Sequence, residues 1–319
     1  MALDARNPND PHQPIARAAR FLGSQNRVGQ EVSLRGLSRR YPRQRERTIY
    51  TCGGYCTLKL VRFTLDSSLP ATTPDTSPLV KYGVVEKDVV IETRAGWVER
   101  TGAEWPLAQV RLLPPCWPSK IVCVGRNYHE HAKELGNPVP AEPVIFLKPP
   151  SALSAHGDPV IYPALASRVD YEGELGIVIG RRAKHVRPEE APGYVLGYTC
   201  VNDVTARDLQ KKDGQWTRAK GFDTFCPVGP WIVPRQQLEL SQVHLRTWVN
   251  QQLRQEAKLD EMIFSPAEII AYVTAVMTLE PGDLIATGTP AGVGPLAPGD
   301  FVRVEIEGVG VLENRVLAP

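Results

Sequence analysis

Acidic residues occupy every second position at the start of a buried-strand pattern, in the stretch VDYEGELGIVIG. Because successive side chains of a strand point to opposite faces, Asp170, Glu172 and Glu174 are expected to share one face. A fourth acid, Asp203, ends the apolar run YVLGYTCVN. Burying carboxylates is unfavourable unless a cation meets them. Because hard divalent ions prefer oxygen ligands, we predict that Glu172, Glu174 and Asp203 hold Mg²⁺ or Mn²⁺.

Two simpler interpretations of these acids stay open. The carboxylates could pair with Arg or Lys at the surface, or they could line a solvated face of a sheet. Asp170 stands at the start of the strand pattern, where water has the easiest access. We therefore expect Asp170 to be solvated and not to be a metal ligand.

A second candidate is the polar stretch VGRNYHEHAKELGNP, which follows an apolar strand pattern ending at Val124. His131 and Glu134 are three residues apart, so they are neighbours if this stretch is helical. A histidine oriented by a carboxylate can act as a general base near neutral pH. The HEH sequence does not have the spacing of the HExxH motif of zinc proteases. The alternative is a polar helix surface with one half-buried histidine.

Polar residues that could bind an anion follow Asp203 along the chain. Arg207 and Gln210 lie in TARDLQ, and Lys220 lies beside a glycine in RAKGFDTFCPVGP, which we expect to be an apolar loop. Such a lysine could bind an anion or stabilise a developing oxyanion. The glycine-rich ATGTPAGVG has neither the P-loop nor the dinucleotide-binding spacing, but its Thr289 and backbone N–H groups could face a carboxylate. Each of these residues could instead be a surface charge or part of a turn.

The amino-acid composition is typical of a soluble globular protein. Of its 319 residues, 42% are hydrophobic and 23% are charged, and the formal net charge is +2. This balance gives no electrostatic reason for binding nucleic acid or a membrane, and no run approaches the roughly 20 apolar residues of a membrane helix. The first residues lack the apolar core of a secretory signal. The six cysteines are scattered, which favours a reduced cytoplasmic protein.

The first 57 residues differ from the rest of the chain. They contain ten Arg, no Lys and four acidic residues, which gives this segment a net charge of +6. The segment has no apolar period, so we expect it to be disordered. Three interpretations stay open: a nucleic-acid-binding arm, an organelle transit peptide, or an extension without a role. Cys52 and Cys56 form a CxxxC pair, which would need further partners to make a metal or redox site.

Strand and turn patterns begin at the end of this segment. The stretches LKLVRFTL and LVKYGVVEKDVVIET predict a small β domain over residues 58–115. Residues 116–319 read as one body of short strands and Pro/Gly turns with few helices. The clearest helix is predicted over residues 265–279, with Ser265 as N-cap and Pro266 in the first turn. Each of the two PGD sequences precedes an apolar run and predicts a turn followed by a strand.

Seven motif blocks follow one another along the chain: GRNYHEHAKEL, KPPSAL, VDYEGELGIVIG, GYTCVNDVTARDLQ, AKGFDTFCPVGP, MIFSPAEIIAYVTAVMTLEPGDLIATGTPAGVGPL and GDFVRVEIEGVGVLEN. Together they resemble the fumarylacetoacetate hydrolase family, in particular its smaller members of the acylpyruvase and 2-hydroxyhepta-2,4-diene-1,7-dioate isomerase type. The resemblance runs from about Leu58 to the C-terminus. It implies a fold of the α+β class, mainly β: a mixed β-sandwich roll of the fumarylacetoacetase C-terminal-domain type with a small N-terminal β unit.

The resemblance also implies roles for the candidate residues and a homodimer. Residues 116–319 would form the catalytic domain, and Asp170 would not be a ligand. The implied Mg²⁺ or Mn²⁺ ligands are Glu172, Glu174 and Asp203, the implied catalytic residues are His131, Glu134 and Lys220, and the implied substrate-binding residues are Arg207, Gln210 and Thr289.

The implied activity is the conversion of small 2-oxo mono- or dicarboxylates, as in the breakdown of aromatic compounds, through a metal-stabilised enolate. Hydrolysis of a C–C bond in an acylpyruvate is favoured, together with isomerisation of 2-hydroxyhepta-2,4-diene-1,7-dioate. The N-terminal unit is too short for a true fumarylacetoacetase. An oxaloacetate tautomerase or decarboxylase is the alternative within the family. A nucleic-acid-associated protein, binding through the Arg-rich segment, is the alternative from another class.

Overall fold

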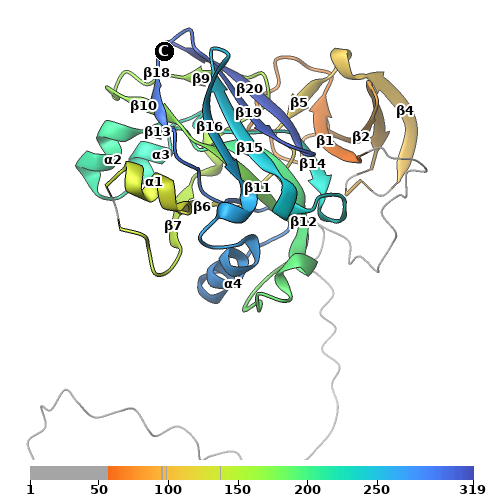
Figure 1. Ribbon diagram of the computed structural model, residues 1–319. Coiled ribbons are helices and arrows are strands. Elements are labelled where there is room, and N and C mark those ends of the chain that lie inside the picture. Colours follow the sequence, from red (N-terminus) through yellow and green to blue (C-terminus); the bar gives the residue numbers. More distant parts are fainter. Residues whose placement is uncertain (1–56, 95, 98, 137) are drawn as a thin grey trace, which may run out of the picture. The chain divides into compact units, whose positions relative to one another are not determined.

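β-Strands dominate the described part of the chain, which comprises residues 57–94, 96–97, 99–136 and 138–319 of this computed structural model (Figure 1). Helices are few and short, so the predicted α+β, mainly β class is confirmed. The interpretations of the Arg-rich segment up to residue 56, and of the Cys52–Cys56 pair, lie outside the described residues.

The largest sheet within these residues has twelve strands and runs in the order β4-β3-β2-β1-β14-β12-β11-β17-β6-β7, with β5 on β1 and β8 on β14. Most neighbours pair antiparallel, but β6 and β17 pair parallel although they are far apart in sequence. The strands are β1 (Lys59–Thr64), β2 (Lys81–Glu86), β3 (Val89–Thr93), β4 (Arg100–Pro106), β5 (Arg111–Leu113), β6 (Ile121–Gly125), β7 (Val144–Lys148), β8 (Leu153–Ser154), β11 (Gly173–Ile179), β12 (Val195–Asn202), β14 (Cys226–Pro234) and β17 (Leu284–Ala286).

Two smaller sheets complete the β-structure of the described residues. One has the order β13-β10-β18 and the other has the order β16-β15-β19-β20-β9. Both PGD turns are followed by the strands that the sequence predicts, β17 and β19. The strands are β9 (Val160–Ile161), β10 (Val169–Tyr171), β13 (Thr205–Ala206), β15 (His244–Val249), β16 (Gln252–Lys258), β18 (Gly294–Leu296), β19 (Phe301–Ile306) and β20 (Gly310–Leu317).

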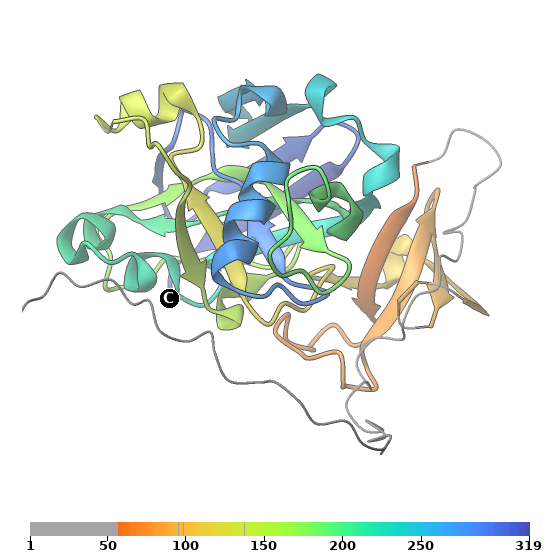
Figure 2. The same ribbon diagram turned by 90° about the horizontal axis from the view of Figure 1, so that it is seen from below.

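Helix α4 covers one face of the largest sheet (Figure 2). Its predicted start is confirmed: Ser265 accepts from the backbone N–H of Glu268, whose side chain accepts in return from the Ser265 N–H. This capping box satisfies N–H groups that the first helical turn leaves free. The α-helices are α1 (His129–Glu134), α2 (Arg207–Asp213), α3 (Thr217–Lys220) and α4 (Pro266–Val276), and the short 3₁₀ helices are η1 (Leu107–Gln109), η2 (Pro150–Ala152), η3 (Ala191–Tyr194), η4 (Arg235–Gln237), η5 (Leu240–Gln242) and η6 (Leu259–Glu261).

The core lies between α4, the largest sheet and the five-stranded sheet that contains β15 and β19. Ile269, Ile270 and Val273 of α4 are fully buried and pack in one cluster with Ile177 of β11 and Ile285 of β17. Burying an aliphatic side chain of this size contributes about 1.5–3 kcal/mol. Strands β6, β11 and β12 contribute to this core. Strand β11 carries Glu174, β12 ends directly before Asp203, and β6 precedes α1, which carries His131.

Strands β1 to β4 lie at the opposite end of the body from α1, α2 and α3 (Figure 1). They nevertheless continue the largest sheet, because Leu60 of β1 pairs with Ile232 of β14. The hydrogen-bonded sheet therefore crosses the point near residue 115 where the sequence pattern predicts a domain boundary. That boundary stays a prediction.

The cysteines of the described residues are free and buried, namely Cys116, Cys123, Cys200 and Cys226. Burial raises the pKa of the Cys116 thiol to about 12, so this thiol is unreactive at neutral pH. Among the described residues, no helix combines the length and apolar character that crossing a bilayer requires.

Candidate active site

The acidic stretch is divided between two sheets. Its first part forms β10 of a small sheet, its last part forms β11 of the largest sheet, and Glu172 is the single residue between them. Glu174 lies on β11, and Asp203 directly follows β12, the antiparallel neighbour of β11. The backbone N–H of Asp203 donates to the Glu172 carbonyl at 2.8 Å. This strand pairing brings all three acids to one place.

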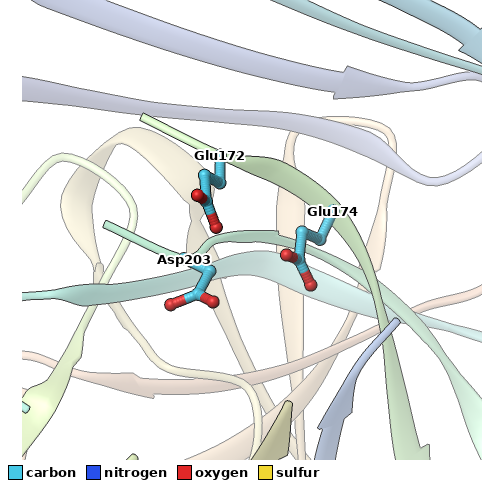
Figure 3. A group of neighbouring side chains, drawn as sticks. All are labelled: Glu172, Glu174 and Asp203. Atoms are coloured by element: carbon cyan, nitrogen blue, oxygen red, sulfur yellow. The ribbon is translucent and has the colours of Figure 1, made fainter. Parts of the chain in front are cut away.

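The three carboxyl groups form a compact buried cluster (Figure 3). One oxygen from each of Glu172, Glu174 and Asp203 lies within 4.8 Å of the others. All three side chains are at most 4% exposed. Burial, followed by the charges of Asp203 and Glu172, raises the pKa of Glu174 well above its usual range. A buried cluster of three carboxylates offers only oxygen atoms as ligands, and a bound cation would offset the repulsion between their charges. The cluster therefore fits Mg²⁺ or Mn²⁺.

Two buried lysines lie against these acids. Lys220 is the last residue of α3, and not part of a loop as the sequence suggested, because residues 217–220 close one helical turn. Its Nζ donates to Glu172 Oε2 at 2.7 Å and to Asp203 Oδ2 at 2.6 Å. Lys148 Nζ donates to Asp203 Oδ1 at 2.5 Å. Burial alone would raise the pKa of Glu172, but Lys220 and then Arg207 lower it below its usual range.

Lys148 is a residue of this cluster that was not predicted from the sequence. It ends β7, whose sequence VIFLK is otherwise apolar, and it is 1% exposed. A lysine is almost never buried unless it is paired, so a lone lysine at the end of an apolar strand was a usable signal. Its partner Asp203 is 55 residues away, which no local pattern reveals.

Asp170 is fully buried, so the expectation that it is solvated is wrong. Strand β10 has neighbours on both sides, β13 and β18, and arginines approach both oxygens of the carboxylate. Arg168 Nε donates to Oδ1 at 2.8 Å, and Arg207 Nε donates to Oδ2 at 3.0 Å. Arg207 also donates to Glu172 and to Gln210 Oε1. The predicted substrate-binding pair Arg207–Gln210 therefore begins α2 with its side chains held by protein groups.

His131 and Glu134 lie together on α1, as their spacing predicts. His131 is 4% exposed, and its Nδ1 lies 3.3 Å from Glu134 Oε2. Glu134 also accepts from the backbone N–H of Gly292 at 3.1 Å. The carboxylate thus orients the imidazole and ties α1 to the glycine-rich segment.

The glycine-rich segment supports the acids. The Gly288 N–H donates to Glu174 Oε2 at 2.8 Å, so it binds a protein carboxylate. Thr289 Oγ1 donates to the Gly173 carbonyl at 2.9 Å and accepts from Gln255 at 2.7 Å. Gly288 has φ +100°, and a Cβ there would lie 2.6 Å from the Asn127 side chain, so only glycine fits.

A pocket of 490 Å³ opens over these residues. A larger cavity of 760 Å³, lined in part by Trp231 and Arg303, contains none of the predicted site residues. The smaller pocket is therefore the better candidate, because it joins the carboxylates to the histidine. Its lining includes every predicted site residue except Glu134. It also includes residues that were not predicted from the sequence, namely Arg126, Leu135, Phe146, Lys211 and Trp216.

Comparison with known families gives two adjoining matches. A family model described as "Fumarylacetoacetate (FAA) hydrolase C-terminal" matches residues 120–317, and one described as "Rv2993c-like, N-terminal" matches residues 59–115. Oxaloacetate tautomerase YisK of Bacillus subtilis is 41% identical over 240 residues, which is 70% of this chain and 80% of that protein.

Two solved structures extend the comparison to the fold. A 2-hydroxyhepta-2,4-diene-1,7-dioate isomerase from Mycobacterium marinum has a TM-score of 0.72 and 46% identity, covering 82% of this chain and 99% of its own. A maleylpyruvate hydrolase from Sphingobium sp. SYK-6, in complex with manganese(II) and pyruvate, has a TM-score of 0.66 and 34% identity with the same coverage.

Proposed function

Because the chain belongs to the fumarylacetoacetate hydrolase family, we propose that it is a divalent-metal-dependent enzyme acting on small 2-oxo acids. One observation carries the proposal: the buried Glu172, Glu174 and Asp203 carboxylates and the buried His131 imidazole line the same pocket. A cation site beside a general base is an arrangement suited to acid–base chemistry on a substrate that chelates a metal through neighbouring oxygens.

Glu172, Glu174 and Asp203 are proposed to hold Mg²⁺ or Mn²⁺. When bound, such an ion acts as a Lewis acid that stabilises negative charge on a substrate oxygen. The manganese(II) and pyruvate in the maleylpyruvate hydrolase structure support this proposal. Arg207, Gln210 and Thr289 are proposed to position the carboxylate of the 2-oxo acid.

His131 is the proposed general base, and Glu134 is the residue that positions it. For an acylpyruvate, His131 takes a proton from water, and the resulting hydroxyl group adds to the acyl carbonyl carbon. The bond from that carbon to the CH₂ group of the pyruvate part then breaks. The electron pair passes to the pyruvate part, which receives the proton back from His131. Lys220 lies within the pocket, where its charge stabilises the negative charge that develops.

The same residues can serve related reactions that also move a proton on the carbon next to the 2-oxo group. We favour C–C hydrolysis of an acylpyruvate and keep isomerisation of 2-hydroxyhepta-2,4-diene-1,7-dioate beside it. Tautomerisation or decarboxylation of oxaloacetate is the alternative, supported by the similarity to the Bacillus subtilis tautomerase. Homodimerisation, a cytoplasmic location and a role in the breakdown of aromatic compounds stay predictions.

A substrate panel tests the proposal. Purified protein is assayed with Mg²⁺ or Mn²⁺ against acylpyruvates, oxaloacetate and the seven-carbon dienoate, each with a matched reaction containing EDTA. We expect turnover of at least one substrate that EDTA abolishes and added metal restores. Turnover that persists in metal-free protein, or no turnover of any of these substrates, contradicts the proposal.

A further inference from the structure

Arg126 lines the pocket, and the proposed mechanism leaves its positive charge unused. It is partly buried. It forms no hydrogen bond or ion pair with any residue that the structure describes. Lys148, Lys220 and Arg207, by contrast, are all paired with protein carboxylates.

The backbone at Arg126 is held in an unfavourable conformation. Its φ is +59°, in the left-handed region that costs a residue with a side chain about 1–3 kcal/mol. The next residue, Asn127, fixes this turn, because its side-chain amide donates to the Thr287 carbonyl at 2.7 Å and to the Phe264 carbonyl at 3.0 Å. Glycine would adopt the same φ at lower cost. An arginine at this position therefore calls for a function of its side chain.

Lys211 supplies a second positive charge to the same pocket. It lies on α2, four residues after Arg207, so both side chains lie on the same side of the helix. Lys211 is exposed and has no hydrogen-bond or ion-pair partner within the described residues. Its neighbour Lys212 is also exposed but does not line the pocket.

The charges of the pocket divide into two groups. Lys220 and Arg207 lie against the acids of the candidate metal centre. Arg126 and Lys211 have no such acid. The pocket lining also includes the aromatic pair Phe146–Trp216, whose rings meet edge to face. A guanidinium that has no protein carboxylate as partner is suited to bind a carboxylate of the substrate.

We propose that Arg126, assisted by Lys211, binds a second carboxylate of the substrate and so selects 2-oxo acids that carry an acid group at the far end. This inference rests on the proposed function, because it takes the 2-oxo end of the substrate to lie at the three carboxylates. Arg126 is then a specificity-determining residue and not a base or metal ligand.

The decisive variant is Arg126→Gly, compared with Lys87→Gly. Lys87 is an exposed lysine with φ +57° in the turn between β2 and β3. Its replacement by glycine removes a positive charge and an unfavourable φ, as Arg126→Gly does, but at a position that does not line the pocket. Neither change should lower the melting temperature. If Arg126→Gly keeps the melting temperature of the wild-type protein, a loss of ligand binding in this variant cannot result from unfolding.

Binding is measured by calorimetry with Mn²⁺ present, using 2-oxoglutarate and pyruvate as probes that share the 2-oxo acid end. We expect the wild-type protein and Lys87→Gly to bind 2-oxoglutarate at least about tenfold more tightly than pyruvate. Arg126→Gly should raise the Kd for 2-oxoglutarate about 10- to 100-fold and change the Kd for pyruvate by no more than about twofold. Equal losses for both probes, or a wild-type protein that does not prefer 2-oxoglutarate, overturn the inference.

Turnover distinguishes this inference from the proposed function. With fumarylpyruvate and acetylpyruvate as substrates, Arg126→Gly should lower kcat/KM only for fumarylpyruvate, mainly through a higher KM. If neither compound is turned over but the binding preference holds, the proposed hydrolysis fails and the inference stands. Lys211→Ala should weaken 2-oxoglutarate binding about two- to fivefold, and this effect should shrink at high salt, while Lys212→Ala should have none.

Discussion

Asp170 accepts a hydrogen bond from Arg207 Nε at 3.0 Å, and the Asp170 carboxylate is completely buried. This contact holds the guanidinium so that its other nitrogens reach Glu172 and Gln210. We expect Asp170→Asn to lower the free energy of unfolding by about 3 kcal/mol, because it leaves a mostly buried arginine without its full counter-charge. Urea denaturation measures this loss.

The control for Asp170→Asn is Arg168→Gln. Arg168 binds the same carboxylate, but its side chain is 51% exposed, so its loss should cost less than about 1 kcal/mol. Similar small losses for both variants would mean that the Asp170–Arg207 contact does not hold the site together.

Glu174→Gln should stabilise the metal-free protein and abolish its response to metal. In the folded protein the pKa of Glu174 is raised above its ordinary value of 4.5 by burial and by the neighbouring acids. The folded state therefore holds a proton that the unfolded state has released, and metal-free stability falls as pH rises above about 4.5. Glutamine removes this cost, and each kcal/mol regained raises Tm by roughly 2–4 °C.

Thermal unfolding at pH 5 and pH 8, with EDTA or with Mg²⁺, measures both effects of Glu174→Gln. The advantage of the variant in EDTA should be larger at pH 8. Mg²⁺ should raise the Tm of the wild-type protein, since a ligand that binds only the folded state stabilises it, and should leave the variant unchanged. A variant that keeps its Mg²⁺ response would exclude Glu174 as a ligand.

His131→Asn should lower kcat by about 10²–10⁴-fold, the usual contribution of a general base, while the Kd for Mn²⁺ stays unchanged. Glu134→Gln should lower kcat less, because the amide oxygen can still accept from the Gly292 N–H while the charge that orients the histidine is lost. His129→Asn is the matched control, since His129 is exposed on the same helix and does not line the pocket. Equal losses at His129 and His131 would refute the assigned role.

Lys148→Met should destabilise the metal-free protein by about 3 kcal/mol, because Asp203 loses the buried partner at its Oδ1. Bound Mg²⁺ adds positive charge beside the same acid, so the stabilisation by Mg²⁺ should be larger in the variant than in the wild-type protein. Chemical denaturation with and without Mg²⁺ gives both values. An unchanged Mg²⁺ increment would show that Lys148 and the metal act independently.

Removal of residues 1–57 should leave metal-dependent kcat/KM unchanged, because the described residues that line the proposed pocket all lie between residues 124 and 289. The same pair of proteins tests the nucleic-acid alternative. Salt-sensitive binding of DNA or RNA that disappears on truncation would support it. Loss of turnover in a folded truncated protein would contradict an extension without a role.

Local spacing was sufficient for some parts of this site and not for others. His131 and Glu134 meet because three residues make almost one helical turn. Glu172 and Glu174 come together although Glu172 lies between β10 and β11, because side chains two residues apart along an extended chain point to the same side. Asp170 was wrongly expected to be solvated because β13, β18 and Arg207, which lie beside it, all follow much later in the chain. Arg126 has no periodic pattern at all, since its position depends on a left-handed turn.

The β1–β14 pairing has a consequence for how these molecules behave in concentrated solution. Without residues 58–115, the β14 edge around Ile232 would present free N–H and C=O groups, through which sheets of separate molecules can join. Among the residues that the structure describes, the sheet ends at β4, an exposed strand that carries Arg100 and Glu104. Charged side chains on an outer strand discourage such joining. We therefore expect the small β unit of residues 58–115 to reduce aggregation by covering the edge of β14. A fragment that starts at residue 116 is expected to precipitate.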